Sequence, residues 1–96
     1  MTDIRLISKR NRQIKPLVEA ALANELRLLE TGLRQTEQRL REFEKKYQML
    51  TQDFISRYEN DEIEETMDFV EWIGESRLLK CLREKVETIR DIQFAN

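Results

Sequence analysis

Four carboxylates in the second half of the chain have the spacing of one helical face. They follow one another at intervals of four, three and four residues, as Glu64, Asp68, Glu71 and Glu75. Residues at these intervals lie on one side of an α-helix. Carboxylates alone would hold a hard cation only weakly, so metal binding is the minor interpretation. We prefer two others, with equal weight: a docking face for a basic protein, and a solvated face that keeps the protein soluble. No Glu-x-x-His motif accompanies it, so we expect no metal site and no cofactor.

The chain lacks the residues that enzymes use most often. It has no histidine, which is the most common general base, and only one cysteine, Cys81. A cysteine without a histidine is a poor candidate for a nucleophile. Cys81 lies beside Leu78 and Leu82, so we expect it to be a small core residue. There is no glycine-rich phosphate loop either, and the sequence predicts a non-enzymatic protein.

The single cysteine also bears on the compartment. It cannot form a disulfide within the chain, which favours a reducing environment. The N-terminus lacks the apolar run of a signal peptide, and no stretch approaches the roughly 20 apolar residues of a membrane span. We therefore expect a soluble, cytoplasmic protein without a membrane partner.

Composition predicts one small domain of long, solvated helices. Of the 96 residues, 38% are charged, and glycine and proline together number three. The net charge is only −2, but residues 1–15 hold five bases and one acid, whereas residues 59–75 hold eight acids and no base. This segregation of charge is more informative than the sum.

Residues 1–15 are interpreted as a basic arm that precedes a helical domain over residues 16–96. The bases are dense enough for non-specific contact with nucleic acid, although no aromatic residue lies among them for base stacking. A solvated tail is the simpler interpretation. The bases in question are Arg5, Lys9, Arg10, Arg12 and Lys15.

A heptad repeat between Leu22 and Leu50 organises the rest of the chain. Its apolar residues alternate in steps of three and four, with Thr36 in the one polar slot, and such a seam must be covered by another helix. We expect five residues of this seam to serve self-association: Leu26, Leu29, Leu33, Leu40 and Phe43.

Three helices are expected, which makes the fold all-α. The first runs over about residues 16–50, with Pro16 in its first position. Thr51 is placed to cap a short helix over about 52–58, and the last helix runs over about 62–93, with acids in its first turns.

The charges beside the two seams predict how the long helices pair. In the heptad numbering, the e positions of the first helix are Glu30, Glu37 and Glu44, and those of the last helix are Arg83 and Arg90. Only an antiparallel pair brings e positions together, so we expect an antiparallel hairpin with the short helix in its connection. A two-helix hairpin cannot bury every apolar stripe. We therefore expect two hairpins to pair as a four-helix bundle, or one hairpin to pack on a different protein.

One turn of the last helix is apolar almost all round. It contains Phe69, Val70, Trp72 and Ile73. This turn is either the closed end of the hairpin, packed on Phe54 and Tyr58, or an anchor for a partner, since tryptophan is frequent in interface hot spots. As a partner-binding surface we consider Asp68, Phe69, Glu71, Trp72, Ile73 and Glu75.

The middle of the chain resembles a family of small prokaryotic helical-hairpin proteins. The likeness covers roughly residues 40–89 and rests on four motifs: Lys46–Met49, Asp53–Phe54, Arg57–Glu59 and Met67–Trp72. The family pattern is KYGM, FxxRxE, a GELGDD-like turn and MDFxEW. Here Gln48 replaces the glycine, and residues 59–65 lack the glycines of the turn, so this turn is expected to be more helical.

Members of that family often occur as the antitoxin-like half of toxin–antitoxin pairs, notably of the TumA type beside a TumE-like ribonuclease. The resemblance therefore implies a non-enzymatic subunit that binds and neutralises a basic ribonuclease toxin. The alternative is a self-associating structural or adaptor coiled coil without such a partner.

Overall fold

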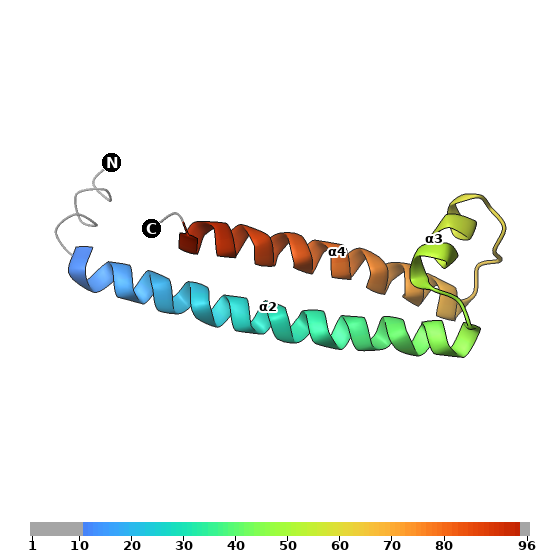
Figure 1. Ribbon diagram of the computed structural model, residues 1–96, viewed down its shortest axis with the longest axis horizontal. Helices are drawn as coiled ribbons and strands as arrows, with labels where there is room; N and C mark the ends of the chain where they lie inside the picture. Colours follow the sequence, from blue (N-terminus) through green and yellow to red (C-terminus); the bar gives the residue numbers. More distant parts are fainter. Residues whose placement is uncertain (1–10, 95–96) are drawn as a thin grey trace.

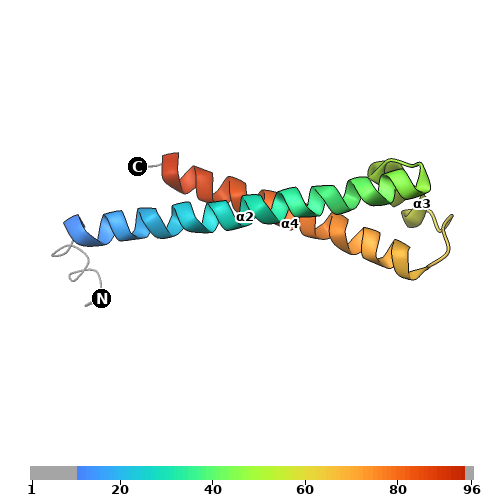
Figure 2. The same cartoon turned by 90° about the horizontal axis from the view of Figure 1, so that it is seen from below.

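The computed structural model describes residues 11–94, and among them the chain forms α2 (Asn11–Tyr47), α3 (Thr51–Glu59) and α4 (Met67–Phe94). Helices α2 and α4 lie side by side and antiparallel, and α3 folds back in the connection at the closed end of the hairpin (Figure 1). Seen from below, α4 crosses α2 at a shallow angle (Figure 2). The predicted all-α antiparallel hairpin with a short connecting helix is confirmed.

Helix α2 begins earlier than the sequence suggested. Residues 11–15, assigned above to the basic arm, form its first turn, and Pro16 lies inside the helix instead of at its first position. Proline lacks an N–H, so the helix loses one hydrogen bond to the carbonyl of Arg12 at this point. The rest of the arm, residues 1–10, lies outside the described residues.

Helix α2 ends in a turn with a left-handed residue. Gln48 has φ 53°, and the N–H of Met49 donates to the carbonyl of Glu44 at 3.1 Å. This six-to-one bond is the Schellman C-cap, in which glycine is the preferred left-handed residue. The Gln48 side chain adds a bond from Nε2 to the carbonyl of Lys45 at 2.7 Å. Gln48 therefore occupies a backbone position that favours glycine.

A carboxylate from α2 caps the first turn of α3. The N–H of Thr51 donates to Glu44 Oε2 at 2.8 Å, and Leu50, the N-cap residue, makes no side-chain cap. The prediction that Thr51 caps this helix is thus wrong, because Thr51 is its first residue. A carboxylate at this position satisfies an orphan N–H and complements the helix dipole.

The connection from α3 to α4 is longer than expected. A second Schellman turn closes α3, with Asp61 at φ 57° and a bond of 2.9 Å from the N–H of Glu62 to the carbonyl of Arg57. Thr66 then caps α4, since its Oγ1 accepts the N–H of Phe69 at 3.1 Å. The last helix therefore starts at Met67, not near Glu62, and the acids of residues 59–65 do not lie in its first turns.

Two apolar clusters hold the hairpin together. The closed-end cluster comprises Leu40, Phe54, Trp72 and Ile73, and the open-end cluster comprises Leu29, Val86 and Ile89. Thr36, the polar residue of the heptad run, is 1% exposed, and a buried polar residue in such a seam can help to fix its register.

The predicted pairing of e positions is confirmed. Arg90 Nη2 lies 2.8 Å from Glu30 Oε2, and Arg83 Nη2 lies 3.5 Å from Glu37 Oε2. The third acid, Glu44, meets the start of α3 instead of a base. These pairs place one side of α2 against the corresponding side of α4, as an antiparallel register requires.

Candidate protein-interaction surface

The aromatic turn of α4 is the core of the closed end, not a surface anchor. Trp72 is fully buried and Ile73 is 8% exposed. The Trp72 ring stacks on Phe54 of α3 with centroids 3.9 Å apart, and on Phe43 of α2 at 5.5 Å. Its Nε1 donates to Thr51 Oγ1 at 3.0 Å. The assignment of Trp72 and Ile73 to partner binding is therefore corrected, because a folded hairpin leaves neither side chain available.

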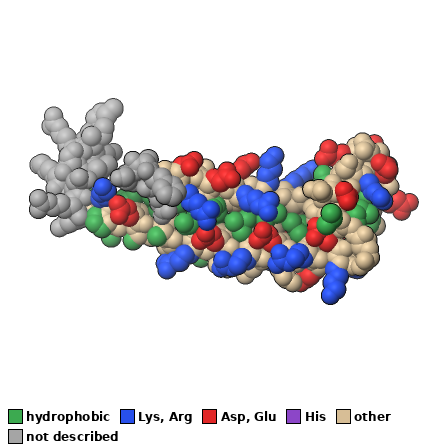
Figure 3. All heavy atoms as spheres, viewed as in Figure 1, with side chains coloured by type: hydrophobic (Ala, Val, Ile, Leu, Met, Phe, Trp, Pro, Cys, Tyr) green, Lys and Arg blue, Asp and Glu red, His purple; other side chains and the backbone are tan. Residues whose placement is uncertain are grey.

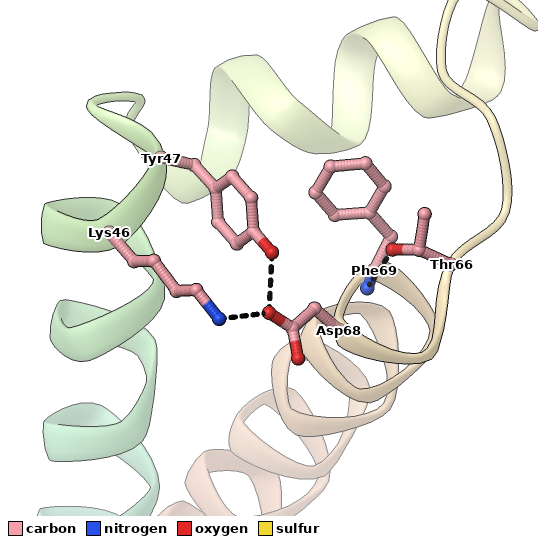
Figure 4. Close-up of polar contacts among 5 residues, drawn as sticks. All are labelled: Lys46, Tyr47, Thr66, Asp68 and Phe69. Atoms are coloured by element: carbon pink, nitrogen blue, oxygen red, sulfur yellow. Dashed lines mark hydrogen bonds and ion pairs between the residues drawn. The ribbon is translucent and has the colours of Figure 1, made fainter.

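Asp68 joins the two long helices at this end. It accepts a hydrogen bond from Lys46 Nζ at 2.6 Å and another from the Tyr47 hydroxyl (Figure 4). The bond from the Lys46 ammonium and the bond from Tyr47 hold the pKa of Asp68 below its ordinary value. The same contacts raise the pKa values of Lys46 and Tyr47. Asp68 is thus engaged in an intrachain contact.

Of the other three residues assigned to partner binding, two make contacts within the hairpin and one is exposed. Phe69 is half-buried against Tyr47 and Phe54, with centroids 5.0 and 5.3 Å away. Glu75 pairs with Arg39 at 3.3 Å across the hairpin. Only Glu71 of the six is exposed and makes no ion pair among the described residues.

A different set of residues is exposed beside this core. The connection between α3 and α4 presents acidic side chains at the closed end of the molecule (Figure 3). Met67, the first residue of α4, and Val70, about one turn later, are 78% and 54% exposed. We call this set the closed-end surface; its residues are Asp61, Glu62, Glu64, Glu65, Met67, Val70 and Glu71.

The closed-end surface differs in part from the surface that the sequence suggested. Its acids come from the predicted acidic block, but its apolar contribution is Met67 and Val70 instead of Trp72 and Ile73. The signal that could have identified Val70 is its helical phase, two residues before Trp72 and therefore on the far side of α4. Glu64 lies in the connection, so it does not share a helical face with Asp68.

The self-association residues are used within the hairpin. Leu29 and Leu40 are buried, and Leu26, Leu33 and Phe43 are half-buried partners of the same two clusters. In the hairpin, this seam is covered by α4. Any pairing of two hairpins must use another face.

An open groove runs along one side of the hairpin next to α3. It has a volume of about 670 Å³, and its floor includes Leu40, Ile55 and Leu79, with Leu50 at its edge. Its rim carries both acids and bases, among them Glu84 and Lys80. Since neither sign prevails, the groove is less selective for a charged partner than the closed-end surface.

The remaining predicted sites are only partly described. Arg5, Lys9 and Arg10 lie outside the described residues, as does the side chain of Arg12, whereas Lys15 is exposed on α2. Cys81 is exposed, which corrects its assignment as a core residue. Within residues 11–94, no group of three or more His, Cys, Asp or Glu side chains is placed to hold a metal ion.

The motifs of the family resemblance converge on the closed end. Tyr47, Phe54, Asp68 and Trp72 come from three of its four motifs, and all of them meet there through ring stacking or hydrogen bonds. These residues therefore build the core of the closed end.

None of the described helices is both long and apolar enough to cross a bilayer.

Comparisons of the chain with protein-family models, curated proteins and solved structures find no match.

Proposed function

We propose that this chain is a non-enzymatic, cytoplasmic protein-interaction module whose closed-end surface docks a basic partner protein. The observation that carries the proposal is the concentration of exposed acids beside two exposed apolar side chains. Residues 59–75 include no base, and only two of their acids, Asp68 and Glu75, form ion pairs in the described part of the chain. A surface of one sign steers and orients a partner of the opposite sign.

The hairpin suits this role because its closed end is rigidly built. Stacked rings and the Asp68 contacts fix α3 and the start of α4, so the acidic connection between them is anchored at both ends. Met67 and Val70 add apolar area that such a complex would bury. Electrostatic attraction would then set the rate of encounter, and apolar burial would slow dissociation.

The partner class that we propose is a small basic ribonuclease toxin, for which this chain would be the antitoxin-like subunit. The resemblance on the motifs named above supports this class. Gln48 departs from the family pattern, but its left-handed backbone is one that glycine adopts without strain. The acids would occupy the basic groove in which such an enzyme holds RNA phosphates. A self-contained coiled-coil adaptor is the competing function.

The test is co-expression with the product of the adjacent gene, followed by affinity purification. The key variant combines Glu62→Gln, Glu64→Gln and Glu65→Gln, and a second variant is Met67→Lys. The matched control is Glu19→Gln with Asp91→Asn, which removes one exposed acid from each long helix away from the closed end. We expect the control to retain the complex and each closed-end variant to weaken it at least tenfold.

Two results would reject the proposal. One is the absence of any complex with the wild-type chain. The other is a complex that survives both closed-end variants while they keep the helical circular dichroism of the wild type.

A further inference from the structure

A second apolar stripe on α2 lies outside the seam with α4. Its five residues are separated by three, one, three and seven positions. Because each residue turns an α-helix by about 100°, they lie about 90° round α2 from the seam. Leu17, Val18 and Leu28 are 69%, 50% and 62% exposed. The stripe consists of Ile14, Leu17, Val18, Ala21 and Leu28. A helix with apolar stripes on two sides is typical of a bundle in which it has two neighbours.

Helix α4 contributes to the same side of the hairpin. Leu78 is 41% exposed and Cys81 is exposed beside it. A hollow of about 470 Å³ joins the two helices on this side, with the buried side chains of Leu29 and Ile89 among its lining residues. We call this side, with the α2 stripe, Leu78, Cys81 and the hollow, the second face.

The opposite side of the hairpin has a different character. There the ion pairs of Glu30 and Glu37 with α4 flank the seam, and α2 presents the exposed bases Arg27, Arg34 and Arg41. Figure 3 shows this charged side, where basic and acidic side chains follow both helices along a narrow hydrophobic strip. Exposed leucine and valine side chains of α2 thus belong to the second face.

We propose that the second face binds a second copy of this chain, so that two hairpins form a four-helix bundle with Leu28 of each inserted into the hollow of the other. The charges of the face favour this occupant. Glu25 and Lys85 line the hollow from α2 and α4, and neither has an ion-pair partner among the described residues. A two-fold rotation brings the acid of one copy to the base of the other, twice, which is the self-complementarity that an isologous dimer requires.

The hairpin is long enough for a contact of ordinary size. A standard interface buries about 800 Å² on each partner. The molecule extends 60 Å along its long axis and 24 Å across it, so two hairpins paired along one side would meet over an area of this order. The pairing leaves the closed-end surface at the end of the bundle, accessible to a partner protein.

The experiment is sedimentation equilibrium of the wild-type chain and of two charge variants, Leu28→Glu and Lys85→Glu. The control is Arg34→Glu, which changes an exposed residue of α2 on the charged side. We expect a dimer for the wild type and the control, and at least a tenfold weaker dimer for both variants. The combination of Glu25→Lys with Lys85→Glu should restore the dimer, because it exchanges the two charges.

The second readout is the rate at which maleimide modifies Cys81. It should fall as the wild-type concentration rises through the dimer dissociation constant, and it should not depend on concentration in Leu28→Glu. A monomeric wild type at millimolar concentration overturns the proposal, as does a folded Leu28→Glu variant that remains dimeric. Neither result bears on whether the closed-end surface binds a basic protein.

Discussion

The indole of Trp72 donates a hydrogen bond of 3.0 Å to the hydroxyl of Thr51, the first residue of α3. The bond ties the start of α4 to the start of the connecting helix, 21 residues earlier in the chain. The Thr51 N–H is in turn bound by Glu44 of α2. All three helices therefore meet around one threonine.

Removing the hydroxyl at this point should destabilise the hairpin. Thr51→Val keeps the shape of the side chain but leaves the fully buried Trp72 N–H without an acceptor. An unsatisfied buried donor costs about 1–3 kcal/mol, so the free energy of unfolding in urea should fall by that amount. Thr51→Ser retains the oxygen and should lose clearly less. Equal losses for both variants would contradict the role of the bond.

Trp72→Ala should behave as a core mutation. Truncation of a large buried aromatic side chain costs about 3–5 kcal/mol, and here it also leaves Phe54 without its stacking partner. Denaturant unfolding should show this loss in the isolated chain. Val70→Ala, which truncates an exposed apolar residue of the same turn, should change the unfolding free energy little. If Trp72→Ala is as stable as Val70→Ala, Trp72 does not contribute to the core of the closed end.

The stability of the closed end should depend on pH through Asp68. Its folded-state pKa is depressed, so its contribution is complete above the ordinary carboxyl pKa of 3.8 and is lost as the pH falls from there through the folded-state pKa. The raised pKa values of Lys46 and Tyr47 give contributions that are complete below their ordinary values of 10.5 and 10.0 and are lost at more alkaline pH.

Thermal melts across this range check the pH dependence. Asp68→Asn should have a lower Tm than the wild type at neutral pH, and the difference should narrow under acid conditions. Asp91→Asn, an exposed substitution near the end of α4, is the control and should follow the wild type. A constant difference between Asp68→Asn and the wild type at every pH would rule out ionisation as the cause.

The ion pair of Glu37 and Arg83 should make a small but measurable contribution. Both side chains are partly exposed, at 38% and 58%, so a double-mutant cycle with alanine should give a coupling of about 0.2–1 kcal/mol that shrinks in salt. The charge-exchanged pair, Glu37→Arg with Arg83→Glu, should recover most of the stability that either reversal alone loses. Purely additive effects would mean that the pair does not help to set the antiparallel register.

Glycine should be favoured at the end of α2. Gln48 has φ 53°, a conformation that costs a residue with a Cβ about 1 kcal/mol or more. Gln48→Gly should therefore raise the free energy of unfolding by up to about 1 kcal/mol, less the loss of the bond to the Lys45 carbonyl. Gln48→Ala loses that bond and keeps the strain, so it should be destabilised. A glycine variant no more stable than the alanine variant would refute this account of the cap.

The pairing of the long helices was predictable because periodicity and charge report on it directly. The heptad positions identified the residues of the seam, and the acids Glu30 and Glu37 indicated that the two helices are antiparallel. Periodicity could not decide between the two interpretations of Trp72, core or partner anchor, since its main partner Phe54 lies on a short helix whose position no periodic pattern fixes. The start of α4 was misplaced for a related reason, because the Thr66 cap outweighs the preference of acids for a first helical turn.

The positions of the hydrogen bonds between α2 and α4 predict the order in which the parts of the hairpin fold. The contact between Tyr47 and Asp68 closes a loop of 21 residues, whereas that between Glu30 and Arg90 spans 60. Closing a shorter loop costs less conformational entropy, so α2 and α4 should pair first next to the connection and then toward the termini. The ends of the two helices at the termini should also be the first to separate. The acidic connection is then organised while the distal halves of α2 and α4 are still unpaired. The surface that we propose as a docking site would therefore form before the open end of the hairpin.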